Sequence, residues 1–438
     1  MLEVAEIIRL HGAAYLARFA DRLLPSHRRA LRDLEACRTP ALGGHVHQCD
    51  HCGRQVYACH SCRNRHCPKC HRDQTDRWLT AQRARLLPCA YYFLTFTLPD
   101  QLRPLARSHQ KMVYGLLMKS AAAALLTLAR DPRYVGGRLG CLAVLHTWTR
   151  ALLYHPHVHL LVTAGGLSAD GTAWVAPKSG SYLVPVHALS PIFRAKICAG
   201  LHHAGLLDQV PCDIWTKPWV VHCQHAGRGQ KVLDYLGRYI FRVAIANSAL
   251  ERIQDGQVTF RYRDNRTQRL RRVTLSGVEF LQRFLQHVLP RGCMKVRAYG
   301  IWSPTCRRQL DQARTLLTIS APAPTQPASI LQPPAPAAAD PPPIRCPLCR
   351  TGILIRVGVF APQTDAGSMT VSSPEVAHAF ARASAAWRRP SASPTGYPGG
   401  QRVRSEHGVH PEDAGHIRRH VQTITRLTPR ASQHAYAR

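Results

Sequence analysis

Residues 152–163 read Leu-Leu-Tyr-His-Pro-His-Val-His-Leu-Leu-Val-Thr, and the rest of the chain is best interpreted outward from this stretch. Its second half is apolar and β-branched and is followed by two glycines, which predicts a buried strand. Alternate side chains on a strand share a face, so His157 and His159 point the same way, roughly 6.5 Å apart at Cα. Two neutral imidazoles at that separation can chelate one divalent metal ion. A lone His-x-His pair, however, more often belongs to an ordinary surface.

The segments before the histidine strand predict a sheet with a crossing helix. Residues 90–99 are aromatic and β-branched and stop at a proline, and residues 140–146 form a second strand. Between them, residues 101–130 carry leucine and valine at helical spacing. Strand, helix, strand, strand is the start of a split α+β sheet. His146 and His155 lie near the histidine pair, and either could be a third metal ligand or a residue outside the ligand set.

A predicted helix further along the chain carries Tyr235 and Tyr239 on one face, about one turn apart. Tyrosines at this spacing usually form a packing stripe. Here they are accompanied by Lys231, Arg238 and Arg242, which suit a phosphate environment better than a core.

Residues 257–275 alternate arginine with aromatic or β-branched residues around a polar turn, which predicts a basic hairpin. Phosphate contacts from Arg261 and Arg263, combined with stacking on the aromatic residues, would suit single-stranded nucleic acid. The alternative is a solvated edge strand that its charges protect from further pairing.

Cysteine pairs indicate structural zinc. Three Cys-x-x-Cys pairs lie within residues 49–70, whereas a redox dithiol would need a single pair at a helix start. The minimum prediction is one zinc ion on Cys49, Cys52, Cys67 and Cys70. A second ion could be held by Cys59, Cys62 and His66. A fourth pair, Cys346 and Cys349, is a half-site whose partner is not evident, with Cys293 or Cys306 as open options.

The net charge of +33 over 438 residues indicates an acidic partner, with nucleic acid as the first candidate. The N-terminus has no basic start followed by an apolar run, and no apolar stretch long enough to span a bilayer is expected. Paired cysteines arranged for metal also favour a reducing compartment, so we expect a cytoplasmic protein without a membrane partner.

The composition along the chain predicts four parts. These are a helical and zinc-binding domain over residues 1–85, an α+β domain over 88–315, a Pro/Ala-rich linker over 320–343, and a basic, disordered tail over 344–438 with one Cys-x-x-Cys.

Five stretches, in this order, resemble the two-tyrosine HUH transposases of the insertion-sequence-ninety-one family. They are Cys-Arg-Thr-Pro-Ala-Leu-Gly-Gly-His at 37–45, Ser-Cys-Arg-Asn-Arg-His-Cys-Pro-Lys-Cys at 61–70, Phe-Leu-Thr-Phe-Thr-Leu-Pro at 93–99, His-Pro-His-Val-His at 155–159 and Tyr-Leu-Gly-Arg-Tyr at 235–239. The chain departs from the family at Ala298, where a histidine is usual, and in its long tail.

The resemblance implies a replication-initiator-like HUH nuclease domain, an antiparallel sheet with helices, preceded by a small helical and zinc-ribbon-like domain. It implies that His157 and His159 bind Mg²⁺ or Mn²⁺ and that Tyr235 and Tyr239 are the nucleophiles. The expected substrates are single-stranded DNA at the element ends and target DNA in the bacterial nucleoid, cut through a 5′-phosphotyrosine ester.

Two other functions remain open at this point. A plasmid- or phage-type replication initiator would use the same chemistry without joining the DNA to a new target. A zinc-dependent DNA-binding protein would have no catalysis, and its histidines and tyrosines would be structural. Covalent adduct formation separates this last possibility from the other two.

Overall fold

The computed structural model describes residues 2–70, 72–83, 85–180, 182–228, 243–264, 267–319 and 343–363. These residues form a mixed fold of helices and antiparallel sheets, which confirms the predicted α+β class. Short 3₁₀ turns connect the larger elements at Ala20–Arg22, Pro40–Leu42, Asp100–Leu102, Leu207–Gln209, Cys212–Trp215, Asn247–Ala249 and Pro304–Cys306.

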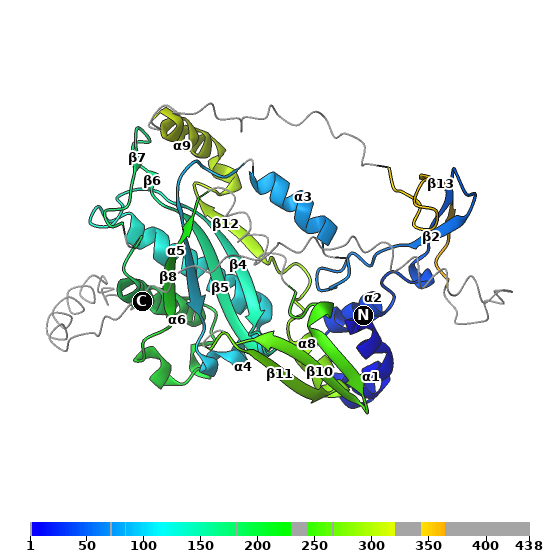
Figure 1. The fold of residues 1–438 in the computed structure, drawn as a ribbon. Helices are drawn as coiled ribbons and strands as arrows, with labels where there is room; N and C mark the ends of the chain where they lie inside the picture. Colours follow the sequence, from blue (N-terminus) through cyan, green and yellow to red (C-terminus); the bar gives the residue numbers. More distant parts are fainter. Residues whose placement is uncertain are drawn as a thin grey trace, which may run out of the picture. The chain divides into compact units, whose positions relative to one another are not determined.

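The largest sheet has five strands in the order β12-β4-β5-β3-β8, and every neighbouring pair is antiparallel (Figure 1). The strands are β3 (Tyr91–Thr97), β4 (Gly140–Trp148), β5 (Tyr154–Thr163), β8 (Val221–Gly227) and β12 (Val296–Gly300). The histidine strand β5 is therefore central, with neighbours on both sides that hold its backbone in register. A short pair of strands, β6 (Gly166–Leu167) and β7 (Trp174–Val175), follows it.

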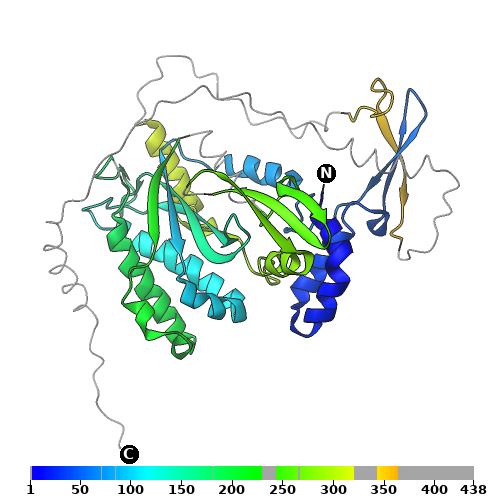
Figure 2. The ribbon, with the colours of Figure 1, turned by 60° about the horizontal axis from the view of Figure 1, so that its bottom comes forward.

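Helices cover one face of this sheet. They are α4 (Arg103–Ser108), α5 (Gln110–Ala129) and α6 (Val186–His203), and Figure 2 shows α5 and α6 on the same side of the strands. The β5 side chains that face them, Val158, Leu160 and Val162, are fully buried, as are Leu117 and Leu125 of α5. The predicted helix over 101–130 is interrupted at His109, whose backbone is not helical.

Helix α5 is also long and apolar enough to cross a membrane by length and composition, contrary to the expectation that no such stretch exists. Most of its surface is buried against the sheet and α6, because it is the central helix of this core. Among the residues that the structure describes, no other helix meets that test.

The opposite face of the sheet carries the histidines and a smaller apolar cluster. Leu142, Val144 and Leu161 pack there with Leu310 and Ala313. The last two residues lie on α9 (Arg307–Ile319), and Trp78 of α3 (Arg72–Arg83) joins the same cluster. This apolar cluster does not extend to the end of the sheet nearer His157. Imidazole side chains take the place of apolar ones there.

A second core forms where the N-terminal helices meet the basic hairpin. Helices α1 (Val4–Phe19), α2 (Pro25–Glu35) and α8 (Gly277–Leu285) pack with a three-stranded antiparallel sheet in the order β11-β10-β9. The strands are β9 (Leu250–Gln254), β10 (Gln257–Arg263) and β11 (Leu270–Ser276). The N-terminal helices thus share a core with residues from the predicted 88–315 domain.

The remaining sheet joins distant parts of the chain. Its order is β13-β1-β2, with β1 (Gly44–Cys49), β2 (Gln55–Cys59) and β13 (Leu354–Phe360). Residues 343–363, which composition had assigned partly to a disordered tail, therefore supply a strand to the N-terminal zinc-binding region. The linker over 320–342 and the tail after 363 lie outside the described residues.

Candidate active site and metal centres

Three histidines converge on the sheet face opposite α5 and α6. His157 and His159 alternate with buried apolar residues on β5, so both point to that face. His146 lies directly opposite His157 on the neighbouring strand β4 and points the same way. The possible ligand atoms of the three imidazoles all lie within 4.8 Å of one another.

Hydrogen bonds orient two of these rings. The Nδ1–H of His157 donates to the backbone oxygen of His155 at 2.7 Å, which leaves Nε2 as the lone-pair nitrogen. Nδ1 of His159 lies 3.0 Å from the Thr95 hydroxyl on β3. A hydrogen bond from Nδ1 to that hydroxyl likewise leaves Nε2 of His159 for a metal, the usual arrangement around ligating histidines.

Burial and ring packing hold the imidazoles in place. His146 and His159 are buried, and burial lowers the pKa of His157 to about 4, so its ring is neutral at physiological pH. Phe93 stacks on His159 with 4.9 Å between ring centroids, and Trp148 stacks on His146 at 4.8 Å. The three rings fit a divalent metal ion because their possible ligand atoms converge and because hydrogen bonds already orient His157 and His159.

His155, the other candidate for a third ligand, has a different partner. Its Nδ1 accepts a hydrogen bond from Nη2 of Arg103 at 3.0 Å, and it is not one of the three converging histidines. The predicted nucleophiles Tyr235 and Tyr239, with Lys231, Arg238 and Arg242, lie outside the described residues. Their chain segment begins just after β8, a strand of the histidine sheet.

The predicted zinc ligands fall into two clusters of four cysteines. Cys67 and Cys70 lie with Cys62 and with Cys37, which follows the end of α2. The Sγ atoms of Cys62 and Cys70 are 3.5 Å apart, as are those of Cys37 and Cys67. This cluster belongs to the N-terminal core beside Leu34.

The second cluster contains Cys49, Cys52, Cys346 and Cys349. The predicted single site on Cys49, Cys52, Cys67 and Cys70 is therefore corrected, because the first pair meets the C-terminal pair and the second meets Cys37 and Cys62. Within the described part of the chain, neither Cys59 nor His66 belongs to such a cluster, and Nε2 of His66 accepts a hydrogen bond from the Leu289 amide at 3.2 Å. The sequence alone did not predict that Cys37 joins a cysteine cluster or that Thr95 contacts His159. An isolated cysteine or threonine has no spacing pattern that would indicate such a role.

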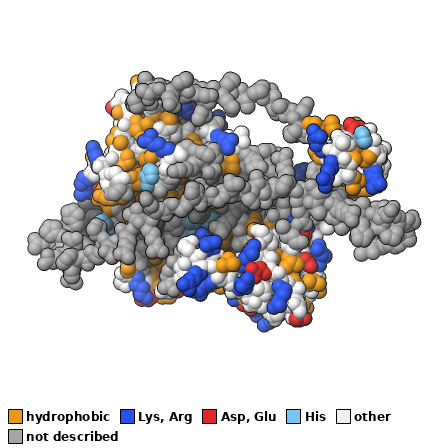
Figure 3. Space-filling view, in the orientation of Figure 1, with side chains coloured by type: hydrophobic (Ala, Val, Ile, Leu, Met, Phe, Trp, Pro, Cys, Tyr) orange, Lys and Arg blue, Asp and Glu red, His pale blue; other side chains and the backbone are white. Residues whose placement is uncertain are grey.

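The basic hairpin differs from its prediction in one respect. Successive residues of β10 point to opposite faces, so Phe260 is buried in the N-terminal core while Arg261 and Arg263 are exposed. The aromatic residues therefore stabilise the fold and do not line a stacking groove. Figure 3 shows basic side chains gathered over this hairpin, and the exposed guanidinium groups still suit phosphate contacts.

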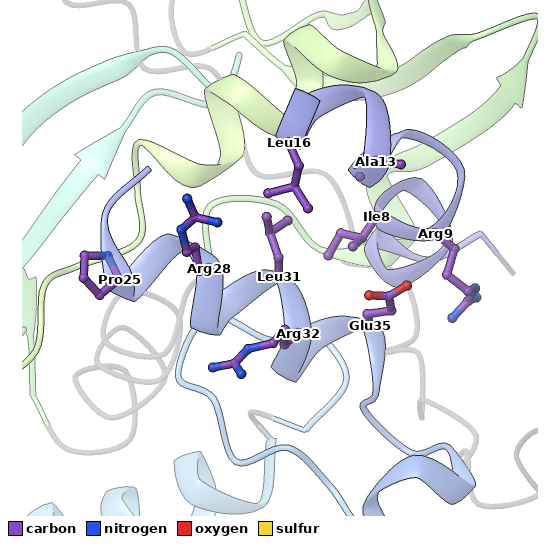
Figure 4. A pocket seen from close by; sticks show the side chains of 10 residues that line it. Ile8, Arg9, Ala13, Leu16, Pro25, Arg28, Leu31, Arg32 and Glu35 are labelled. Carbon is purple, nitrogen blue, oxygen red and sulfur yellow. The ribbon is translucent and has the colours of Figure 1, made fainter. Parts of the chain in front are cut away.

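A pocket of about 590 Å³ lies between α1 and α2 and is separate from the metal clusters (Figure 4). Leu16 and Leu31 contribute to an apolar lining, and Arg9, Arg32 and Glu35 add charged groups. Among the described residues that line it, none is a histidine or a cysteine.

Comparison with known proteins gives matches to two separate segments of the chain. A family model described as a transposase zinc-binding domain matches residues 7–98, and one described as a putative transposase matches residues 140–309. No solved structure matches the chain.

Two curated relatives cover most of the chain. Putative transposase y4qJ of Sinorhizobium fredii is 43% identical over 345 residues, which cover 74% of this chain and 86% of the relative. The transposase for insertion sequence element IS801 of Pseudomonas savastanoi pv. phaseolicola is 32% identical over 350 residues, which cover 73% of this chain and 82% of the relative. The chain therefore belongs to the IS91 family of insertion-sequence transposases with an N-terminal zinc-binding domain.

Proposed function

We propose that this transposase nicks and rejoins single-stranded DNA through a 5′-phosphotyrosine ester on Tyr235 or Tyr239, in transposition of the rolling-circle type. The observation that supports this proposal is the convergence of His146, His157 and His159 on one face of the central sheet. A transposase must cut and join phosphodiester bonds, and these three imidazoles offer ligands for a metal ion that would assist that chemistry.

The three imidazoles would hold Mg²⁺ or Mn²⁺, with Mn²⁺ better suited to nitrogen ligands. Such an ion would polarise the scissile phosphate and offset the charge that develops on its oxygens. Three protein ligands would leave coordination positions for the substrate. Thr95 and the His155 carbonyl would keep His159 and His157 in the tautomers that ligation needs.

The tyrosine supplies the covalent step. Its phenolate oxygen attacks phosphorus, the bond from phosphorus to the 3′-oxygen breaks, and that oxygen takes up a proton as the 3′-hydroxyl leaves. The ester preserves the energy of the phosphodiester bond, so a later 3′-hydroxyl can attack it and release the tyrosine. A second tyrosine one helical turn away in sequence allows the target strand to be cut while the first ester persists.

The test is to incubate the full chain with labelled single-stranded DNA from an element end and Mg²⁺ or Mn²⁺, and to run a denaturing gel. We expect a labelled band at the protein's mass that EDTA abolishes and that the double variant Tyr235→Phe/Tyr239→Phe lacks. Tyr182→Phe, a change at an exposed tyrosine elsewhere, is the matched control. Bound DNA without any covalent band would instead support a non-catalytic DNA-binding protein.

Transfer of the bound strand to a second, unlabelled oligonucleotide tests the joining step. A labelled product of combined length is expected of a transposase that acts on DNA in the bacterial cytoplasm. Nicking that only restores the original strand would favour a replication initiator.

A further inference from the structure

We propose that the chain binds a second structural zinc ion, held jointly by an N-terminal knuckle with Cys49 and Cys52 and a C-terminal knuckle with Cys346 and Cys349. The C-terminal knuckle lies beyond both matched family models, which cover residues 7–98 and 140–309. The proposal is independent of the cleavage chemistry.

The sulfur positions fit one tetrahedral ion. Zinc–thiolate bonds of about 2.3 Å place the sulfurs of a tetrahedral site about 3.8 Å apart. The Sγ atoms of Cys49 and Cys349 are 3.6 Å apart, and those of Cys52 and Cys346 are 3.9 Å apart. A disulfide would need about 2.05 Å, so the four thiols are arranged as ligands and not as two bridges.

The two knuckles have the same backbone construction. In each, the oxygen of the first cysteine accepts a hydrogen bond from the amide four residues later, Gly53 at 3.0 Å and Arg350 at 2.9 Å. Both of those residues have a left-handed φ, +67° for Gly53 and +63° for Arg350. This conformation is unusual for arginine, and its repetition at the matching position indicates that both loops are folded around the same kind of ion.

Amide groups also point at the sulfurs. The amide of Cys52 donates to Sγ of Cys49 and the amide of Gly352 donates to Sγ of Cys349, both at 3.4 Å. Such donors stabilise the thiolate form that binds zinc. A Cβ at Gly352 would collide with Sγ of Cys49, so the close approach of the two knuckles requires glycine there.

Hydrogen bonds connect the knuckles across the chain. Asp50 accepts from the Ile353 amide through its Oδ1 at 2.7 Å, and its own amide donates to the Ile353 oxygen at 3.1 Å. Beyond them, β1 and β13 pair from Cys49 opposite Leu354 to Gly44 opposite Phe360.

Apolar burial alone is too small to hold this three-stranded module together. In the part of the chain that the structure describes, its buried cluster consists of Cys49, Val56, Cys346 and Leu354, two of which are ligands. Val357 and Val359 on β13 are more than half exposed. Small modules with so little core depend on metal for folding, so zinc closes a ribbon whose last strand is synthesised some 300 residues after its first.

The experiment measures zinc per chain in the full-length protein by elemental analysis. We expect Cys49→Ser/Cys52→Ser and Cys346→Ser/Cys349→Ser each to lose one zinc ion relative to the unmodified chain. The quadruple variant should lose one ion as well, because all four residues hold the same one. Cys198→Ser/Cys212→Ser, outside both clusters, should lose none.

A loss of two ions in the quadruple variant, or no loss when Cys346 and Cys349 are replaced, would overturn the proposal. Hydrogen exchange on the unmodified chain provides a readout that does not depend on variants. Partial zinc removal should release the amides of β1 and β13 together, and continued protection of either strand would also contradict a shared ion.

Discussion

At the scale of single residues, the orientation of the histidine rings depends on neighbouring groups that are not themselves candidate metal ligands. His159 lies between Phe93, which stacks on its ring, and Thr95, whose hydroxyl meets Nδ1. His157 is oriented by a backbone carbonyl, which no substitution of a side chain removes. Metal affinity should therefore be most sensitive, outside the ligands, to Thr95.

Replacing Thr95 with valine should lower metal affinity and cleavage by about 10- to 100-fold, because the β-branched shape remains while the hydrogen bond to His159 is removed. Thr95→Ser keeps the hydroxyl and should retain nearly full activity. The measurement is the Mn²⁺ concentration that gives half-maximal adduct formation. Equal values for the two variants would show that this hydroxyl does not position the ligand.

His146 and His155 give opposite predictions. His146→Ala should reduce metal-dependent cleavage by roughly a hundredfold or more, since it removes one of the three converging imidazoles that would hold the metal ion. His155→Ala should retain activity within about tenfold, because its side chain bonds Arg103 and its carbonyl is unchanged. Cleavage rates at saturating Mn²⁺ compare the two, and the reverse order would exchange their roles.

At the scale of elements, alternation along strands separates the two faces of each sheet. The exposed arginines of β10 face away from the core that Phe260 fills. Glu251 lies close to two arginines of this hairpin, Arg261 and Arg272, so part of the positive charge is already compensated. The exposed arginines of the hairpin are suited to contacts with the phosphate groups of DNA.

Arg261→Gln/Arg263→Gln should weaken DNA binding and lower the slope of log affinity against log salt by about 1.4, roughly 0.7 for each phosphate group of single-stranded DNA that the variant no longer neutralises. Fluorescence anisotropy of labelled single-stranded DNA at several salt concentrations measures both quantities. Arg130→Gln/Arg133→Gln, at the end of α5, is the charge-matched control. An unchanged slope in the hairpin variant would place the DNA elsewhere.

Elements with strong local patterns could be predicted from the sequence. Composition predicted a strand over 90–99 and one over 158–162, and these lie in β3 and β5, although β5 begins earlier, at Tyr154. Helical spacing predicted a helix over 101–130, which the structure divides into α4 and α5. The strand Leu354–Phe360 could not be predicted, because it is flanked by a Pro/Ala-rich stretch and pairs with residues far away in the sequence. Spacing likewise identified cysteines as ligands, but long-range pairing decides which cysteines share an ion.

At the scale of the whole molecule, buried histidines make stability depend on pH. His287 is buried between the Thr147 hydroxyl and the Leu152 carbonyl, and burial lowers its pKa to about 4. The unfolded value is about 6.5, so the unfolded chain binds the proton more readily. The stability that His287 contributes is therefore fully present above pH 6.5 and is lost as the pH falls toward 4.

The loss attributable to His287 should reach about 3 kcal/mol at pH 4. His287→Gln offers polar atoms for the same two partners and does not titrate, so its unfolding free energy should fall less between pH 7 and pH 4. Denaturant unfolding of both proteins across this range isolates the effect, since every other titrating group is shared. Parallel pH profiles would mean that the pKa of His287 is the same in the folded and unfolded states.

The most direct measurement of the central claim identifies the amino acid that carries the DNA. The covalent adduct formed with Mn²⁺ is digested with nuclease and trypsin, and the modified peptide is sequenced by mass spectrometry. Tyr235 and Tyr239 lie in different tryptic peptides, Val232–Arg238 and Tyr239–Arg242, so the experiment tells them apart. We predict a nucleotide on the tyrosine of one or both peptides, absent when His157 is replaced by alanine. A nucleotide on any other residue, or an adduct that forms equally well without His157, would contradict the account.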